Sequence, residues 1–238
     1  MITTIKPFVI SLTFVLGFMF LFYEIGVALQ IVDKQRKAAK SNWGRLNRYQ
    51  PMSLGAVILK RITDIAVALP VCLVVLPILW LVLGCIIKID SKGPVFFKQK
   101  RPGLHGKDFT CYKFRSMYWN CEDRMATPDD ARVTRVGRFI RKTHLDEIPQ
   151  FFNILIGDMS LVGPRPIPSK NLDVYGFGKL EEIRTLVRPG LTGYNQLFGR
   201  SSQGAVYCWL DMHYVQNLSW RRDIRVMLAT LKFKDRAY

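Results

Sequence analysis

Two long apolar segments in the first 90 residues constrain this chain more strongly than any other feature. The first runs from Phe8 to Val32 and the second from Ile62 to Ile89, and the rest of the sequence is polar and basic. At about 1.5 Å of helix rise per residue, each segment can cross a hydrocarbon core of roughly 30 Å. Glu24 interrupts the first segment, which is costly at mid-bilayer but tolerable toward an end. In 238 residues, such segments leave room for one well-packed domain.

The first apolar segment fits either a transmembrane helix or a cleavable signal peptide. Gly26 to Ala28 weakly resembles a cleavage site, but Lys6 is the only basic side chain before the segment. The region that follows has a basic cluster, made of Lys34, Arg36, Lys37, Lys40, Arg45, Arg48, Lys60 and Arg61. Such clusters stay in the cytoplasm. We therefore predict a transmembrane helix over residues 1–33 with its N-terminus outside, and a basic juxtamembrane linker over residues 34–61.

The second apolar segment is basic at both ends and contains Pro70 and Pro77. The basic residues after it are Lys88, Lys92, Lys98, Lys100, Arg101 and Lys107. Because both ends favour the cytoplasm, a helix that enters the membrane, bends and returns fits better than a straight span. Proline supplies the bend by removing a backbone donor. We predict a re-entrant helix hairpin over residues 62–89, kinked near Pro77. The alternative is an ordinary kinked span that places the following domain outside.

The formal net charge of +17 indicates a polyanionic partner, either nucleic acid, an anionic lipid surface or phosphate-rich substrates. The apolar segments favour the lipid surface, and no nucleic-acid motif is present. Over residues 219–233, one helical face collects Trp220, Ile224, Met227, Leu228 and Leu231. This pattern fits a helix at the membrane interface and fits equally a helix packed on the domain core. A shorter basic and apolar pattern occupies residues 135–142.

Residues 90–238 read as a small, helix-rich α/β domain on the cytoplasmic face. The pattern predicts strands at 95–100 and 109–114, and helices near 116–124, 135–142, 146–156 and from Val206 onward. The last turn of the 146–156 helix should end at Gly157. The five cysteines form no metal-binding or CxxC spacing and are expected to be free thiols, and the three histidines have no ligand spacing.

Asp146 and Glu147 are adjacent carboxylates before Pro149. Acidic residues in a first helical turn complement the helix dipole, which is the structural interpretation. The functional interpretation is a carboxylate nucleophile beside a carboxylate that binds a divalent metal. Cations surround the pair, namely Arg132, Arg135, Arg138, Arg141, Lys142 and Arg165. Arginine's planar fork matches phosphate oxygens, and Pro164 and Pro166 fix the backbone that presents Arg165.

From Lys60 to Phe233 the chain resembles the bacterial sugar transferase family, the monotopic phosphoglycosyl transferases. The matching strings are KRITD at 60–64, DSKGPVFF at 90–97, QKR at 99–101, KFRSM at 113–117, RVTRVG at 132–137, LDEIPQFFNILIGDMSLVGPRP at 145–166, RPGLTG at 188–193 and Leu210-Asp211. This resemblance favours the functional interpretation of the carboxylate pair. It also implies a re-entrant helix bent at a Ser-Pro pair, where this chain has Leu76 and Pro77.

The resemblance implies that the enzyme moves a sugar-1-phosphate from a UDP-sugar to undecaprenyl phosphate at the inner membrane and starts glycan assembly. Asp146 would be the nucleophile, and Glu147 would hold Mg²⁺. Arg141 and Arg165 would bind substrate phosphate or nucleotide. The same matched strings imply that four more residues bind substrate phosphate or nucleotide, namely Lys113, Arg115, Pro164 and Arg188. Anionic lipids are expected partners, and the oligomeric state stays open.

The donor sugar also stays open, because Ile156 stands where a lysine is common and residues 201–208 depart from the family pattern. The first apolar segment lies outside the resemblance. Two other classes of function compete with the transferase. A non-catalytic membrane adaptor would be favoured by a degraded carboxylate pair, whereas this pair is intact. A membrane-anchored nucleic-acid binder would show salt-sensitive DNA binding and no UMP release.

Overall fold

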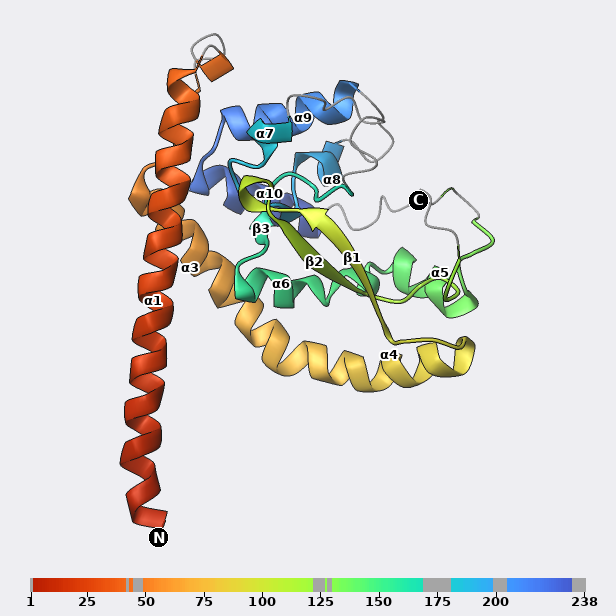
Figure 1. Ribbon diagram of the computed structural model, residues 1–238. Coiled ribbons are helices and arrows are strands. Elements are labelled where there is room, and N and C mark those ends of the chain that lie inside the picture. Colours follow the sequence, from red (N-terminus) through yellow and green to blue (C-terminus); the bar gives the residue numbers. More distant parts are fainter. Residues whose placement is uncertain are drawn as a thin grey trace.

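The computed structural model describes residues 2–41, 43–44, 49–121, 127, 130–168, 181–198 and 205–232. A helix-rich α/β domain lies beside one long helix, α1 (Ile2–Lys40), as Figure 1 shows. Within the described ranges, two helices are long and apolar enough to cross a membrane, Thr13–Lys40 and Leu54–Asp90. The predicted helix-rich α/β class is confirmed.

Helix α1 is longer than the transmembrane helix predicted over residues 1–33. It continues through the basic residues to Lys40. Asp33 and Lys37, one turn apart on its surface, form an ion pair of 2.6 Å. Residues 14–16 and 18–23 of α1 expose large apolar side chains, whereas Ala28, Ile31 and Val32 are buried. These three pack with Met52 and Val57. One part of α1 therefore suits lipid, and the next part is built into the protein.

The second apolar segment is one bent helix, made of α3 (Leu54–Pro70), a five-residue π-helix (Val71–Val75) and α4 (Leu76–Asp90). The Leu76 N–H donates to the carbonyl of Val71, five residues back. In Figure 1, α3 runs beside α1, and α4 then turns away beneath the domain. The irregular segment lies between Pro70 and Pro77, so both prolines flank the bend that was predicted near Pro77 alone.

Two small sheets accompany the helices. Strands β1 (Phe96–Pro102) and β2 (Asp108–Phe114) pair antiparallel in a β-hairpin, with Phe96 opposite Phe114, which confirms the two strands predicted at 95–100 and 109–114. Strands β3 (Ser160–Val162) and β4 (Gly190–Thr192) pair in parallel. The sequence did not indicate the second sheet, because three residues are too few to show an alternating pattern.

The remaining elements include the expected helices and two short helices, over residues 181–184 and 194–198, that were not expected. They are α5 (Arg135–Lys142), a 3-10 turn (Leu145–Glu147), α6 (Gln150–Ile156), α7 (Glu181–Arg184), α8 (Tyr194–Phe198), α9 (Ala205–Gln216) and α10 (Trp220–Lys232). Helix α6 ends at Gly157, whose φ of 94° is the expected left-handed cap. The predicted helix near 116–124 is wrong over residues 116–121. There Met117 bridges Val133, and the Tyr118 N–H donates to the Arg132 carbonyl, so the chain is extended. Its last part, 122–124, lies outside the described residues.

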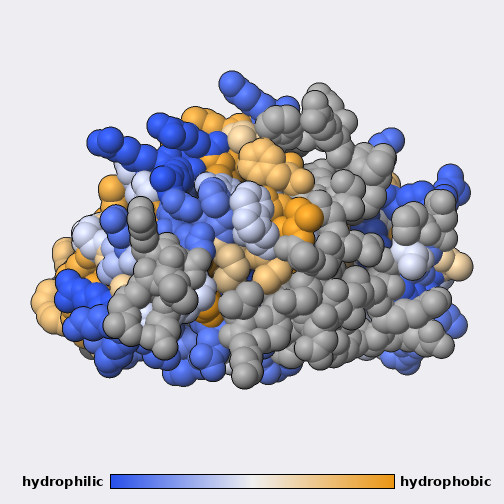
Figure 2. Space-filling view, turned by 90° about the horizontal axis from the view of Figure 1, so that it is seen from above, coloured by the Kyte–Doolittle hydropathy of each residue, from blue (hydrophilic) through white to orange (hydrophobic). Residues whose placement is uncertain are grey.

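Helix α10 fits both interpretations offered for residues 219–233. Val226 is buried in the core and Met227 packs against that cluster. Leu228 and Leu231 are 55% and 71% exposed. The helix therefore packs on the domain with one side and offers leucines on another. Figure 2 shows the top of the domain, where hydrophilic side chains project around a hydrophobic centre.

Asn153 fixes α6 against β2. The fully buried amide donates to the Thr110 carbonyl at 2.8 Å and accepts from the Tyr112 N–H at 3.1 Å. It also donates to Asp158 at 3.2 Å. One side chain thereby pairs backbone groups that the hairpin leaves open, and it sets the position of the helix relative to the strand.

We expect Asn153→Ala to lower the free energy of unfolding by roughly 2 to 4 kcal/mol, because two backbone groups of β2 lose their partner. Denaturation of the full chain in detergent measures this loss. The matched control is Asn217→Ala, which removes a hydrogen bond of 2.9 Å to the His213 carbonyl. Equal effects of the two substitutions would contradict the role given to Asn153.

Candidate active site

The two adjacent carboxylates lie on a short turn between α5 and α6. His144 has a left-handed backbone with φ of 57°, which redirects the chain at the end of α5 into the 3-10 turn Leu145–Glu147. Leu145 then packs against the apolar cluster of Phe114 and Ile140. Anchoring this side chain places Asp146 in the interior, where it is 8% exposed. The carboxylates therefore precede α6 rather than forming its first turn.

Glu147 binds two of the cations predicted for the site. Lys113 on β2 donates to the Glu147 Oε1 atom at 2.6 Å. The Nη2 atom of Arg165, in the loop after β3, lies 3.4 Å from the same oxygen. Three segments far apart in the sequence thus meet at one carboxylate, which is the arrangement expected of a site for an anionic substrate.

The surroundings separate the pKa values of the two carboxyl groups. Burial raises the pKa of Asp146 to about 6, aided by the charge of Glu147 and opposed by Lys113, Arg141 and Arg165. Burial also acts on Glu147, but Lys113 and Arg165 hold its pKa well below the usual range. Glu147 is therefore a fixed anion, whereas Asp146 gains or loses its proton near neutral pH. Two adjacent carboxyl groups with different titration suit two different tasks.

Helix α5 brings Arg141 to this group. The Arg141 Nε atom donates to the Ser116 hydroxyl at 2.7 Å, just beyond the end of β2. The two segments approach each other closely at Gly137. A Cβ atom at this position would lie 1.9 Å from the Ser116 carbonyl oxygen. Glycine at 137 therefore lets α5 pack against the backbone and orient Arg141.

The loop that holds Arg165 is fixed from two sides. The Arg184 Nη2 atom donates to the Arg165 carbonyl at 2.6 Å, and the Arg184 Nε atom donates to Asp211 at 2.8 Å. Asp211 also accepts from Asn195 at 2.5 Å and from the backbone of Arg165. On the other side, Arg101 donates to the Pro166 carbonyl. Sequence reasoning missed these supports, although Arg101 and Asp211 lie in strings that it singled out.

Arg115 and Arg188, also predicted to bind substrate, make their hydrogen bonds elsewhere. Arg115 is buried and donates to the carbonyls of Ser91 and Pro94 at 2.8 and 2.6 Å, beyond the end of α4. Arg188 donates to Glu24 at 3.1 Å. Pro164 accepts from the Gly190 N–H at 2.8 Å and so fixes the loop before Arg165. The structure thus gathers Asp146, Glu147, Lys113, Arg141 and Arg165, and gives the other three residues contacts within the fold.

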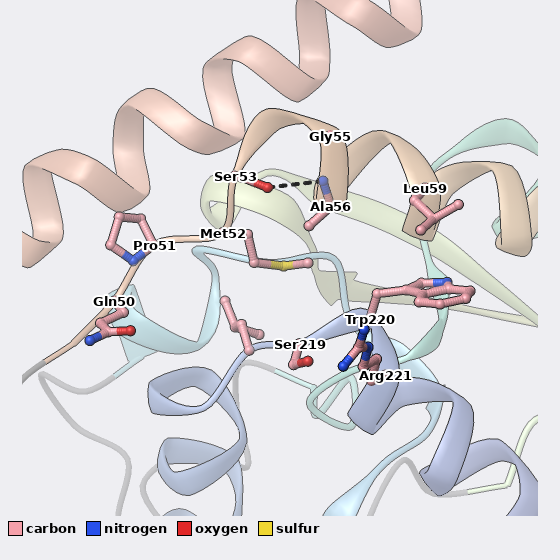
Figure 3. A pocket seen from close by; sticks show the side chains of 11 residues that line it. Gln50, Pro51, Met52, Ser53, Gly55, Ala56, Leu59, Ser219, Trp220 and Arg221 are labelled. Carbon is pink, nitrogen blue, oxygen red and sulfur yellow. Dashed lines mark hydrogen bonds between the residues drawn. The ribbon is translucent and has the colours of Figure 1, made fainter.

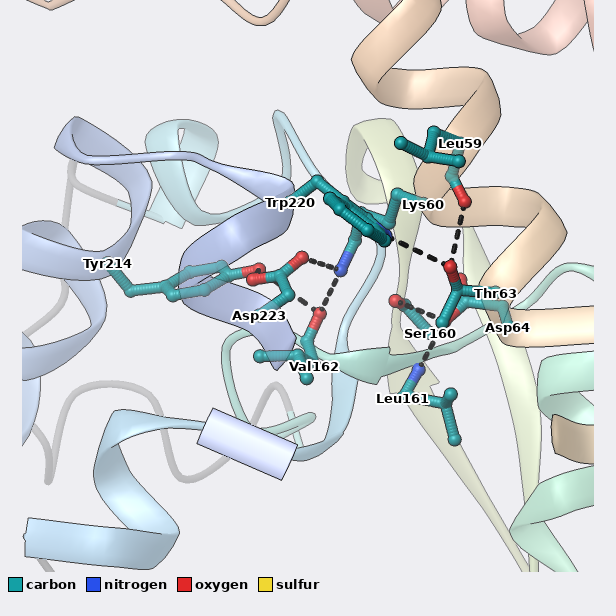
Figure 4. A network of polar contacts seen from close by, with 10 residues as sticks. All are labelled: Leu59, Lys60, Thr63, Asp64, Ser160, Leu161, Val162, Tyr214, Trp220 and Asp223. Atoms are coloured by element: carbon teal, nitrogen blue, oxygen red, sulfur yellow. Dashed lines mark hydrogen bonds and ion pairs between the residues drawn. The ribbon is translucent and has the colours of Figure 1, made fainter. Parts of the chain in front are cut away.

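The apolar helix α3 holds the strand that leads to Arg165. Asp64 accepts from the Ser160 hydroxyl at 3.0 Å and from the Leu161 N–H at 2.9 Å. Lys60 donates to the Val162 carbonyl at 2.8 Å and pairs with Asp223 of α10 at 2.5 Å. Figure 4 shows these polar side chains meeting between α3, β3 and α10. The orientation of the loop therefore depends on a helix that is otherwise apolar.

A cavity of about 570 Å³ lies apart from the carboxylate pair (Figure 3). It is lined by residues 50–53, by the first turns of α3 including Leu59, and by residues 218–221. None of the predicted site residues lines it. The cavity therefore lies at the junction of α3 and α10.

The carboxylate pair also fits a magnesium ion that is held mainly by its substrate. Within the described ranges, no group of three or more histidine, cysteine or acidic side chains stands together. Mg²⁺ does not need such a cage, because it keeps waters and commonly takes one or two carboxylates plus substrate phosphates. Glu147, a carboxylate held ionised, is the ligand type that it prefers.

The chain is similar to several known sugar transferases. The family model for bacterial sugar transferases matches residues 55–234. The "Uncharacterized sugar transferase EpsL" of Bacillus subtilis is 42% identical over 183 residues, which cover 74% of this chain and 87% of that protein. The "UDP-glucose:undecaprenyl-phosphate glucose-1-phosphate transferase" of Klebsiella pneumoniae is 45% identical over 185 residues, which cover 74% of this chain and 40% of that protein. "Exopolysaccharide production protein ExoY" of Sinorhizobium fredii is 36% identical, covering 76% of this chain and 89% of that protein.

The fold and the site define a transferase of the sugar-phosphate type, with apolar helices suited to a membrane. The chain belongs to the bacterial sugar transferase family. The expected family membership is thereby confirmed. The match begins in α3, so α1 lies outside it.

If Asp146 is the nucleophile that the sequence predicts, we expect transferase activity to rise with pH through a midpoint near 6, because the pKa of Asp146 is about 6 and only an ionised carboxylate is nucleophilic. Lys113→Met should move the midpoint to higher pH, since the lysine charge lowers that pKa. Initial rates across a pH series at saturating substrate measure both. An activity that is flat through pH 6 would contradict the titration given to Asp146, as would an unmoved midpoint in the variant.

Proposed function

We propose that this enzyme transfers a sugar-1-phosphate from a UDP-sugar to undecaprenyl phosphate in two displacements. An Asp146 carboxylate oxygen attacks the β-phosphorus of the donor. The bond from that phosphorus to the bridging oxygen breaks, and UMP leaves with the electron pair. An oxygen of undecaprenyl phosphate then attacks the same phosphorus and releases the Asp146 carboxylate. The products are UMP and undecaprenyl diphosphate-sugar.

The single observation that supports this proposal most is the pairing of a buried, titratable Asp146 with a fixed Glu147 anion inside a group of three cations. Lys113, Arg141 and Arg165 supply positive charge for a diphosphate, and burial makes Asp146 less hydrated than an exposed carboxylate. A covalent route also suits two bulky anionic substrates, because they need not occupy the site together. The donor and the acceptor follow from the names of relatives, such as the Salmonella typhimurium "Undecaprenyl-phosphate galactose phosphotransferase".

Mg²⁺ belongs to the proposal as a cofactor held by Glu147. When bound, the ion supplies charge neutralisation for the diphosphate and its leaving group. The chain's own residues supply the rest. Lys113 and Arg165 keep Glu147 ionised and in place. Arg141, held by Ser116, lies where it lowers the pKa of Asp146 and favours its charged form.

We also propose that the bent helix α3–α4 is re-entrant, and that the domain lies at the cytoplasmic face of the bacterial inner membrane. Contacts between the domain and the C-terminal half of α1 support this. Gln35 donates to the Leu186 carbonyl at 3.4 Å and accepts from the Met52 N–H at 2.9 Å. The residues after the first apolar segment and the domain therefore lie together. Their excess of basic residues favours the cytoplasm and contact with anionic lipid.

We expect Asp146→Asn to abolish UMP release from a UDP-sugar in the presence of undecaprenyl phosphate and Mg²⁺, because the amide is not a nucleophile. Glu147→Gln should reduce release nearly to background. A panel of UDP-sugars assayed with membrane-reconstituted enzyme measures both and identifies the donor. The matched control is Asp108→Asn, an exposed acidic residue at the start of β2. Full turnover by Asp146→Asn would end the covalent proposal.

We expect cysteines placed at Lys37 and Lys107 to react with a membrane-impermeant maleimide from the same, cytoplasmic side. The experiment uses intact cells and inverted vesicles, with the native cysteines replaced. A straight crossing by residues 54–90 would instead place the two positions on opposite sides. That result would contradict the re-entrant helix.

A further inference from the structure

Glu24 is a buried carboxylate on α1, the helix that lies outside the family match. It is 8% exposed, although the surrounding helix surface is apolar and open. Its Oε1 atom accepts from Arg61 of α3 at 2.7 Å, and its Oε2 atom accepts from Arg188 at 3.1 Å. Both guanidinium groups are themselves more than nine-tenths buried. A charged residue in an apolar helix is costly unless its partners are specific, so these contacts need an explanation.

Through Arg61, Glu24 reaches the helix that follows the carboxylate turn. Arg61 donates to the carbonyls of Ile154 and Leu155, at 2.6 and 2.9 Å. These groups lie in the last turn of α6, and that helix begins three residues after Glu147. Gly157, the cap of α6, lies against the ion group, because a Cβ atom there would be 3.4 to 3.5 Å from Arg61, Arg188 and Glu24.

Through Arg188, Glu24 reaches the loop that presents Arg165. The carbonyl of Pro189 accepts from the Ser160 N–H at 2.8 Å. The Gly190 N–H donates to the Pro164 carbonyl, also at 2.8 Å. The segment that begins at Arg188 is therefore joined by backbone hydrogen bonds to the residue directly before Arg165.

We infer that Glu24 is a positioning residue for the transfer reaction. Through Arg61 and Arg188, this carboxylate joins the turn that carries Asp146 and Glu147 to the loop that carries Arg165. The inference rests on the proposed function of the site. It gives α1 a part in catalysis besides that of an apolar anchor. It also gives Arg188 the task of receiving this carboxylate.

The electrostatics of the group explain why the carboxylate matters. Without Glu24, two buried guanidinium groups would face each other, and their remaining acceptors within the described residues would be the carbonyls of α6. Breaking a buried ion pair from one side leaves an uncompensated charge, and the structure relieves it by moving apart or admitting water. Either response shifts α6 and the Arg188 segment relative to each other. Displacements of about 1 Å at a reacting centre can reduce rates by up to about 100-fold.

The test compares Glu24→Gln with Asp33→Asn in the full chain, reconstituted in lipid nanodiscs. Each substitution removes one negative charge from α1, but Asp33 is exposed and forms its ion pair with Lys37 at the surface. We expect Glu24→Gln to lower kcat for UMP release about tenfold or more per folded molecule, with little change in the KM of the donor. Asp33→Asn should stay close to the unsubstituted enzyme. Folded protein is quantified by thermal unfolding of the same samples.

A double variant separates positioning from simple loss of stability. Glu24→Gln combined with Arg188→Gln removes the unpaired charge, so part of the lost kcat should return. Glu24→Asp, which keeps the charge but shortens the side chain, should give an intermediate rate. If Glu24→Gln does not fold, this milder variant serves in its place. Unchanged kcat per folded molecule in the variant tested would overturn the inference.

Hydrogen–deuterium exchange gives a readout that does not depend on activity. Glu24→Gln, or Glu24→Asp in its place, should speed exchange over residues 154–164 and 188–190 and leave the β1–β2 hairpin unchanged. Uniform or absent change would count against the inference. An unsubstituted enzyme that releases no UMP from any donor would instead contradict the proposed function, and the exchange pattern would still decide the role of Glu24.

Discussion

The structure depends on one polar face in the middle of an apolar helix. Lys60, Arg61 and Asp64 of α3 cannot remain in lipid, so the domain must supply their partners. Val162, Ser160 and Leu161 of β3, the last turn of α6 and Asp223 of α10 do so. Removing one member of a buried pair typically costs about 3 to 5 kcal/mol. Helix α3 and the domain are therefore one folding unit, and the proposed membrane placement of α3 would fix the position of the site as well.

The chemistry of the site follows from the same geometry. Helix α3 holds both helix α6 and strand β3. Helix α6 follows the carboxylate turn, and strand β3 precedes the Arg165 loop. Lys113 enters from the hairpin and completes the group around Glu147. Burial of Asp146 beside an ionised neighbour raises its pKa toward neutrality, while three cations keep it from rising further. A carboxyl group with this pKa is mostly ionised at physiological pH, and its burial leaves it weakly hydrated, as the proposed nucleophile requires.

The sequence predicted the local features well and the distant contacts poorly. The hairpin, α5, α6 and the proline-associated bend each have a signal within a few residues. The carboxylate pair and its arginines were predicted through motifs. By contrast, Met117 and Tyr118 pair with Val133 and Arg132 instead of forming a helix, and no local pattern indicates these contacts. The partners of Arg115 and Glu24 are distant in the sequence, and a local pattern does not indicate them. The structural role of Arg115 and the ion pairs of Glu24 were therefore not predicted.

The most direct measurement of the central claim is mass spectrometry of the enzyme incubated with a UDP-sugar and Mg²⁺ in the absence of acceptor. The account predicts a mass increase equal to one glycosyl-phosphate, located on the peptide that contains Asp146 and removed on addition of undecaprenyl phosphate. Release of UMP without any such adduct would contradict a covalent intermediate. An adduct that persists in Asp146→Asn would place the nucleophile elsewhere.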